Sequence, residues 1–161
     1  MRCFTILGPS QTGKTTLLEK LTQFDETPAR RDDDGDLGIV RFSALGEPWC
    51  AIDFPGGPEY AGMAGSALLA SDIAVLCVAP DPNEAVLAAP YIRAIEASGT
   101  PCLLFINRMD TPKARVRDIV AALQAYSSHA IVLRQVPIRE DGQVVGAVDL
   151  ISVGAWRYRE G

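Results

Sequence analysis

Five short runs of apolar and β-branched residues recur along the chain and predict strands. They lie at residues 3–7, 40–42, 49–52, 73–78 and 102–106. Several of these runs are too continuously apolar for strands that keep one face in water. A sheet built from such strands needs helices on both faces, so the pattern predicts a layered α/β domain.

Longer segments with helical character separate these strands. The clearest covers about 112–125, where Thr111 is the expected N-cap, Pro112 lies in the first turn, and apolar residues recur at i, i+3, i+4 and i+7 from Val116. Two others are expected at about 14–23 and 82–97. The alternation of strands and helices predicts a mainly parallel sheet with right-handed crossovers.

Prolines, glycines and charges interrupt this pattern at three places. Pro90 should kink the helix over 82–97 or split it in two. A shorter helix over about 58–70 is weakened by Gly62 and Gly65. The charged run at 30–36 is expected to form a solvated, mobile loop. Its aspartates do not match a calcium-binding EF-hand loop, because Gly35 is not at the sixth position and no glutamate closes the loop.

The end of the chain departs from the strand and helix alternation. Two β-like runs at 130–138 and 144–151 are joined across Asp141-Gly142, a strong turn signal. We therefore expect a core domain over residues 1–128 and a β-hairpin tail over residues 129–161.

Composition limits the classes of function. With 161 residues and 48% hydrophobic content, the chain suits one compact domain. A net charge of −5 opposes non-specific nucleic-acid binding. The longest apolar run, 73–79, is too short to cross a bilayer, and the chain enters a strand without a processing pattern, so a cytoplasmic protein without membrane contact is expected.

Cysteine and histidine usage predicts no metal site. Cys3, Cys50, Cys77 and Cys102 fall in separate predicted strands without metal-ligand spacing, so we expect reduced cysteines packed in the core. His129 is expected to be a solvated loop residue.

A glycine-rich loop of the form G-x-x-x-x-G-K-T follows the first predicted strand and opens the first helix. Its residues are Gly8, Pro9, Ser10, Gln11, Thr12, Gly13, Lys14 and Thr15, followed by Thr16 in the helix. In such a loop, backbone N–H groups face phosphates, the lysine reaches the outer phosphates, and the hydroxyl of Thr15 can hold Mg²⁺. The sequence therefore predicts a nucleoside triphosphate site in a P-loop NTPase three-layer sandwich with a mainly parallel sheet and a C-terminal β-hairpin.

A second motif, Asp53-Phe54-Pro55-Gly56, stands at the end of the third predicted strand. The carboxylate of Asp53 can hold Mg²⁺ through water, and the N–H of Gly56 can meet the third phosphate because no side chain blocks its approach. By itself the motif is also an acceptable turn. After a phosphate loop, it predicts a sensor of the third phosphate.

A third motif, Asn107-Arg108-Met109-Asp110, ends the fifth predicted strand. The carboxylate of Asp110 can accept two N–H bonds from the edge of guanine, whereas adenine offers no such pair of donors. Asn107 would tie this segment to the phosphate loop, and the stem of Arg108 could lie over the base. The motif therefore selects guanine, although Asp110 could instead cap a helix.

With these motifs in order, the chain resembles the G domain of translational GTPases, most closely the elongation factor G family. The tail segments Gln135-Val136-Pro137-Ile138 and Gly146-Ala147-Val148-Asp149-Leu150-Ile151 resemble the family's segment entering an inserted subdomain. The resemblance implies GTP and GDP binding with Mg²⁺, GTP hydrolysis, and action on the ribosome in translocation or recycling. It also implies downstream domains in a longer parent protein.

Two substitutions relative to that family bear on hydrolysis. Gly57 stands where the family has a water-orienting histidine, and Val40 stands where it has a threonine whose hydroxyl completes the Mg²⁺ shell. We therefore expect weak intrinsic hydrolysis. The alternatives are an ATP-using P-loop enzyme and a nucleotide-binding interaction module that does not hydrolyse its ligand.

Overall fold

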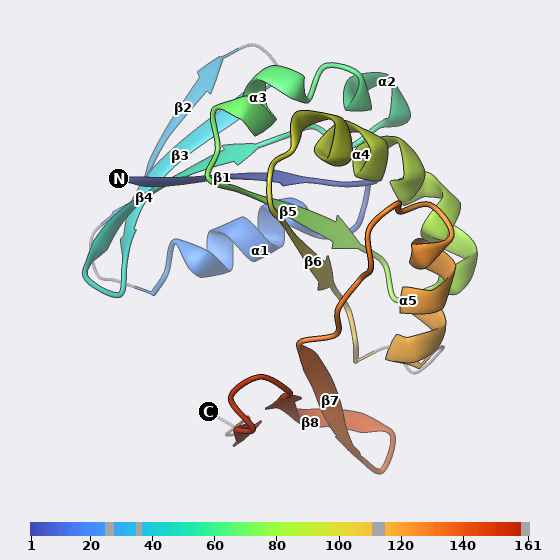
Figure 1. Cartoon of the computed structure of the whole chain (residues 1–161). Coiled ribbons are helices and arrows are strands. Elements are labelled where there is room, and N and C mark those ends of the chain that lie inside the picture. The colour runs from blue at the N-terminus through green and yellow to red at the C-terminus, as the bar shows by residue number, and fades with distance from the viewer. Residues whose placement is uncertain (25–27, 35–36, 111–114, 159–161) are drawn as a thin grey trace.

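The computed structural model describes residues 1–24, 28–34, 37–110 and 115–158. Within them, six strands form one sheet in the order β2-β3-β4-β1-β5-β6 (Figure 1). The strands are β1 (Arg2–Leu7), β2 (Arg30–Asp34), β3 (Leu37–Ala44), β4 (Glu47–Asp53), β5 (Ile73–Val78) and β6 (Cys102–Ile106). Strands β4, β1, β5 and β6 are parallel, whereas β2 and β3 join as an antiparallel edge.

Helices cover both faces of this sheet, as the apolar strands predict (Figure 1). The α-helices are α1 (Lys14–Leu21), α2 (Pro58–Ala61), α3 (Gly65–Leu69), α4 (Ala85–Ser98) and α5 (Val116–Gln124). Helix α1 packs on β1 and β4 around Phe4 and Leu18, while α2, α3, α4 and α5 share the buried cluster on the opposite face. The α/β sandwich predicted from the sequence is therefore confirmed.

One helix prediction needs correction, and for a second the structure excludes one of two alternatives. The expected helix over 58–70 is two short helices, α2 and α3, separated at Gly62–Ala64, because glycine weakens helix propagation. Pro90 does not split the middle helix: α4 continues through it after a 3-10 turn at Pro82–Glu84. A proline in a helix leaves the carbonyl four residues earlier without its usual donor, and here that residue is the exposed Val86, where water can replace the donor.

The charged run is also corrected by the structure. Residues 30–34 of the run expected to form a loop form the edge strand β2, which pairs antiparallel with β3, and residues 35–36 lie outside the described residues. Alternate residues of a strand share a face, so Arg30 pairs with Asp32 and Arg31 with Asp33. Charged side chains suit an edge strand, because they discourage pairing with another chain.

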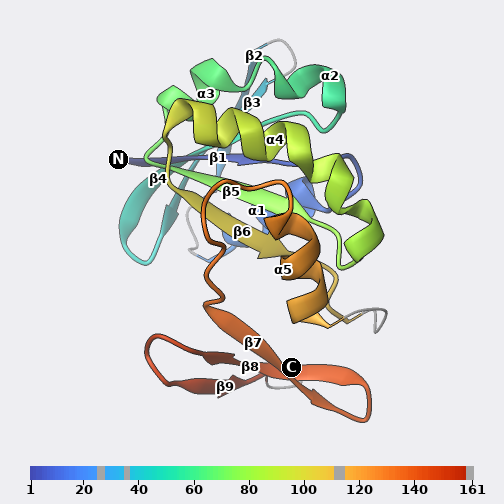
Figure 2. The same ribbon diagram turned by 45° about the vertical axis from the view of Figure 1, so that its right-hand side comes forward.

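The tail forms a second, antiparallel sheet, placed beyond β6 and α5 (Figure 2). Its strands are β7 (Gln135–Glu140), β8 (Gln143–Asp149) and β9 (Ala155–Arg157). The predicted hairpin turn is present: Asp141 and Gly142 both have positive φ, as a type I′ turn requires. Two details differ from expectation, because residues 130–134 are not a strand and β9 adds a third strand.

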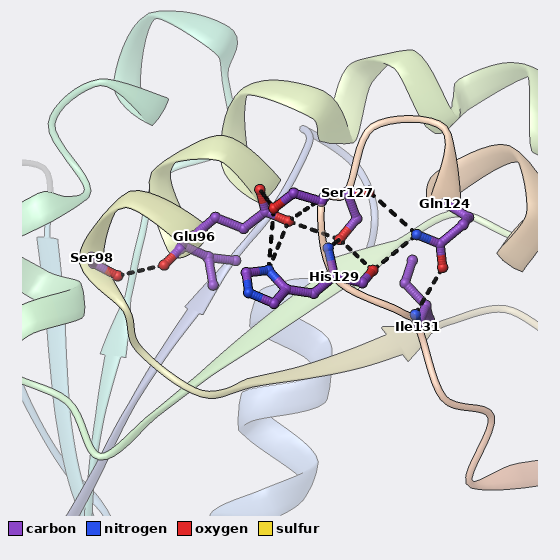
Figure 3. Close-up of polar contacts among 8 residues, drawn as sticks. Glu96, Ser98, Gln124, Ser127, His129 and Ile131 are labelled. Carbon is purple, nitrogen blue, oxygen red and sulfur yellow. Dashed lines mark hydrogen bonds and ion pairs between the residues drawn. The ribbon is translucent and has the colours of Figure 1, made fainter.

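The segment between α5 and β7 is held against α4 by one carboxylate (Figure 3). Glu96 accepts hydrogen bonds from the hydroxyl groups of Ser127 and Ser128 and from the Ser128 amide. These bonds lower the pKa of Glu96 to about 2. His129 is 80% exposed, as expected for a loop residue, but its Nδ1 lies 3.5 Å from Glu96 Oε1.

The burial of the four cysteines depends on the position of their strands in the sheet. All four are free thiols; Cys50 and Cys77 are buried, as predicted, and Cys3 is half-buried. Cys102 is exposed, which corrects the expectation of a core residue, because β6 lies at the edge of the sheet. Among the described residues, no helix combines the length and apolar content needed to span a membrane.

Two helix boundaries differ slightly from the sequence pattern. Helix α1 ends at Leu21 rather than near residue 23. Helix α5 begins at Val116, and the proposed cap at Thr111 and first turn at Pro112 lie outside the described residues. Its buried residues Ile119 and Leu123 lie on the predicted apolar face.

Candidate nucleotide-binding site

The glycine-rich loop connects the end of β1 to the start of α1. Gly8 and Gly13 have φ of 136° and 85°, which side-chain-bearing residues rarely adopt. A Cβ on Gly8 would lie 2.2 Å from the carbonyl oxygen of Cys77 on β5. The loop thus packs directly on the neighbouring strand, and glycine is required there by space as well as by dihedral angle.

Lys14 lies across the loop from which it emerges. Its amine donates to the carbonyl oxygens of Gly8, at 3.0 Å, and Pro9, at 2.9 Å. The Thr12 hydroxyl also donates to Pro9. Burial lowers the pKa of Lys14, and the nearby Asp53 carboxylate opposes that shift. A cation is therefore held inside the loop beside an acidic side chain.

The second motif packs on the glycine-rich loop. Asp53 ends β4 and is buried, and the Ser10 hydroxyl donates to the carbonyl of Gly56. A Cβ on Gly56 would lie 2.4 Å from Lys14 Nζ and 2.9 Å from the Cα of Ser10. Glycine at this position therefore lets the two segments meet.

The third motif contacts the same loop. Asn107 Nδ2 donates to the carbonyl of Thr12 at 2.8 Å, which is the tie to the loop expected of this residue. A Cβ on Gly13 would lie 2.4 Å from that same nitrogen. The Cys77 thiol donates to the same Thr12 carbonyl at 3.3 Å. Segments 95 residues apart in the sequence thus meet at one loop.

The other predicted site residues are exposed. Thr15 and Thr16 lie in the first turn of α1, and Gln11 lies on the loop with φ of 61°. Arg108 and Asp110 follow β6, beyond Asn107, and both are exposed. Arg108 has φ of 55° and its amide donates to Asn107 Oδ1. The structure thus brings Asp53, Gly56 and Asn107 to the loop and leaves Asp110 at the surface, where a ligand can reach it.

The oxygen donors at this site fit Mg²⁺. Mg²⁺ typically uses one or two side-chain oxygens and completes its shell with water and substrate phosphates. The Thr15 hydroxyl and the Asp53 carboxylate match that donor set. Among the residues that the structure describes, no group of three or more His, Cys, Asp or Glu could hold a metal by itself.

Sequence reasoning missed Arg31, which the corrected strand β2 brings to Asp53. Its Nη1 and Nη2 lie 3.3 Å and 3.4 Å from Asp53 Oδ2, and its Nε donates to Asp33 at 3.0 Å. Hydrogen bonding to Asp33, with a smaller contribution from Asp53, raises the pKa of Arg31. The signal in the run that is compatible with a strand is the spacing of opposite charges two residues apart, Arg30 with Asp32 and Arg31 with Asp33.

Sequence reasoning also missed a buried tyrosine beneath the second motif. Tyr91 on α4 is 1% exposed, and its hydroxyl accepts from the Gly57 amide and donates to the Gly57 carbonyl. Burial raises the pKa of this hydroxyl, which keeps it able to donate. Hydrogen bonds with Tyr91 thus hold both the amide and the carbonyl of Gly57.

Val40, the other residue that differs from the resembled family, packs in the buried cluster beside α1.

Comparisons with known proteins support the resemblance drawn from the motifs. The chain is 28% identical, over its whole length, to an elongation factor G-like protein of Synechocystis sp.. It is 29% identical, over 76% of its length, to translation initiation factor IF-2 of Streptococcus pyogenes serotype M5. No protein-family model matches the chain. The predicted resemblance to elongation factor G-like proteins is confirmed.

The fold is likewise shared with a solved structure. A crystal structure of a Thermus thermophilus protein superposes with a TM-score of 0.76 over 99% of this chain, at 24% identity. This chain spans 27% of that structure's chain, 27% of the Synechocystis relative and 13% of the Streptococcus relative. The similarity therefore concerns one segment of longer proteins.

Proposed function

We propose that this chain, similar in sequence to elongation factor G-like proteins, is a GTP-binding G domain of a translation factor. Its parent would act on the ribosome in translocation or recycling, through domains downstream of the G domain. GTP or GDP with Mg²⁺ would occupy the glycine-rich loop. Intrinsic hydrolysis would be weak.

One observation carries the proposal: the second and third motifs both contact the glycine-rich loop. Gly56 lies against Lys14, and Asn107 donates to the Thr12 carbonyl. A helix cap or an isolated turn does not require either contact. Three motifs that each suggest part of a nucleotide are therefore brought to one place.

Different residues of the chain would bind the phosphates, the base and Mg²⁺. Loop N–H groups and Lys14 would bind the phosphates once the lysine exchanges the Gly8 and Pro9 carbonyls for phosphate oxygens. Asp110 would accept the guanine N–H groups, and the Arg108 stem would lie over the base. Thr15 and Asp53 would hold Mg²⁺, which neutralises charge on the outer phosphates.

Slow hydrolysis follows from the second motif. Orientation of the attacking water is a large part of catalysis in this chemistry. Gly57 has no side chain to supply it, and Tyr91 holds its backbone in place. The buried Val40 offers no hydroxyl toward a metal ion. Both features favour binding over turnover.

The test is equilibrium binding of a fluorescent GTP analogue with Mg²⁺, competed by GTP, GDP and ATP. We expect competition by guanine nucleotides alone. Asp110→Ala should weaken guanine nucleotide binding by about 3 kcal/mol, or roughly 100-fold in Kd, because two hydrogen bonds to a charged acceptor are lost. Asp118→Ala, which removes an exposed carboxylate from α5, is the matched control.

Other outcomes would change the proposal. Equal competition by ATP, unaffected by Asp110→Ala, would support an ATP-using enzyme in which Asp110 caps a helix. Tight guanine nucleotide binding without turnover, even with ribosomes present, would support an interaction module. A folded chain that binds no nucleotide would contradict the proposal.

A further inference from the structure

The Arg31 guanidinium bridges two carboxylates across three strands. The residues Asp33, Gly38 and Asp53 lie side by side on β2, β3 and β4 in the sheet register. Arg31 donates to Asp33 on one side and to Asp53 on the other. Its charged group therefore passes over Gly38 to reach the end of β4.

Gly38 makes this path possible. A Cβ at this position would lie 2.3 Å from Arg31 Nη2 and 2.8 Å from Cζ. Any larger residue would require the guanidinium to move. The ion pair with Asp53 therefore depends on a glycine in β3, the strand that separates the two charged partners.

Asp53 is the carboxylate proposed to hold Mg²⁺, and Arg31 uses one of its oxygens. The Asp53 side chain is 9% exposed, whereas that of Arg31 is 47% exposed. A carboxylate so buried is costly to leave without a partner. The half-exposed guanidinium can withdraw into solvent when another cation takes its place, because its own loss of contact is compensated by water.

We propose that Arg31 is an internal counterion of Asp53 that competes with Mg²⁺ at this site. The inference rests on the proposed function, because it concerns Mg²⁺ bound together with nucleotide. When Mg²⁺ and nucleotide bind, the guanidinium leaves Asp53. Nucleotide and Mg²⁺ binding would therefore break the contact that joins β2 to Asp53, so the conformation of this edge strand depends on whether the site is occupied.

The competition predicts an altered Mg²⁺ requirement. Binding of a fluorescent GDP analogue is measured against Mg²⁺ concentration. Arg31→Ala should lower the half-saturating Mg²⁺ concentration by about twofold to fivefold, the range expected for loss of one partly exposed ion pair. Arg30→Ala is the matched control, since Arg30 is the adjacent arginine and pairs with Asp32. It should leave the Mg²⁺ requirement unchanged.

A second variant tests the same contact without removing the arginine. Gly38→Ala places a methyl group where the guanidinium lies, so it should reproduce the effect of Arg31→Ala. Circular dichroism and thermal unfolding identify any variant that fails to fold, and agreement between the two folded variants excludes a general effect of lost charge.

Distinct results overturn the inference. An unchanged Mg²⁺ requirement in folded Arg31→Ala would show that Arg31 does not compete with the metal. Weaker GDP binding by this variant at every Mg²⁺ concentration would mean that Arg31 contacts phosphate instead. If the folded wild-type chain binds no guanine nucleotide at any Mg²⁺ concentration, the proposed function and this inference both fail.

Discussion

Gly57 is fixed by hydrogen bonds to its backbone and lies at the position where the resembled family has a water-orienting side chain. Its φ of 172° is extended backbone that any residue can adopt, and Tyr91 bonds to both its amide and its carbonyl. A Cβ at Gly57 would lie 2.4 Å from the Glu59 carboxylate. Glu59 is exposed, so its flexible end can move aside. The position can therefore accept a side chain without rearranging the backbone.

Gly57→His should raise GTP hydrolysis. The new imidazole would begin beside Gly56, which packs on Lys14, and could orient the attacking water. We expect an increase of about tenfold or more in single-turnover rate, since positioned proton-transfer groups typically contribute ~10² or more.

Gly62→His is the control for this prediction, because a Cβ there meets nothing within 4 Å. It should leave the rate unchanged. An unaltered rate in Gly57→His that folds and binds GTP like the wild-type chain would contradict the role assigned to this position.

At the scale of elements, the predicted strands were those with continuous apolar runs. Strands β1, β4 and β5 bury their residues in the sheet centre, and burial produces the pattern that sequence analysis detects. Strand β2 is charged, because an edge strand with one neighbour need not be apolar. Its pairing with β3 is a tertiary contact, and no periodic pattern in the residues of β2 predicts it.

Two carboxylates that hydrogen-bond the segments around the tail sheet predict that the stability of the fold falls at acidic pH. Glu96 and Asp149 both have a pKa of about 2 in the folded chain, below their ordinary values. Hydrogen bonds from Ser127 and Ser128 hold Glu96 ionised, and the Ser152 amide, aided by Arg134, does the same for Asp149. Because folding favours the ionised form, these groups stabilise the fold above pH 4.5 and lose that contribution as pH falls toward about 2.

Thermal unfolding of the wild-type chain between about pH 5 and about pH 2 tests this. The melting temperature should fall less steeply in Glu96→Gln than in the wild-type chain. Glu47→Gln, an exposed residue at the start of β4, serves as control and should follow the wild-type curve. Parallel acid profiles for Glu96→Gln and wild type would argue against a stabilising role for this carboxylate.

At the scale of the whole molecule, the β6 edge of the main sheet is open within the described residues, as is the charged β2 edge. Strand β6 pairs with β5, and no other described strand pairs with its far edge. Leu103 on β6 is 44% exposed, and a cleft of about 820 Å³ lies between β6, α5 and the tail sheet. The cleft is lined largely by apolar residues, among them Leu104, Val120 and Ile131. An open edge beside apolar surface favours association.

The isolated chain should therefore self-associate in a concentration-dependent way, as measured by sedimentation velocity. Leu103→Lys should reduce association, because a charged side chain on an edge strand discourages pairing. Leu69→Lys on α3, where the leucine is also exposed, should not. A monomer across a wide concentration range would refute this expectation.

The nucleotide motifs illustrate how much of a site a sequence can predict. Gly8 and Gly56 stand where another backbone segment approaches within contact distance, and Gly13 stands where the Asn107 side chain does, so each position leaves no room for a Cβ atom. Asn107 was expected at the loop from its N-x-x-D motif, and its side chain donates to the Thr12 carbonyl there. Arg31 and Tyr91 lie on segments without such motifs, and their contacts arise from the packing of β2 and α4.

The sequence by itself determined the alternation of buried strands and helices, the hairpin at Asp141-Gly142, and the order of the three motifs. These features depend on local dihedral preference and on burial, which leave a periodic trace along the chain. Tertiary structure alone decided that the charged run is a strand, that Arg31 pairs with Asp53, and that Tyr91 holds Gly57. The last two contacts join residues 22 and 34 positions apart, and their energy depends on geometry that no local segment specifies.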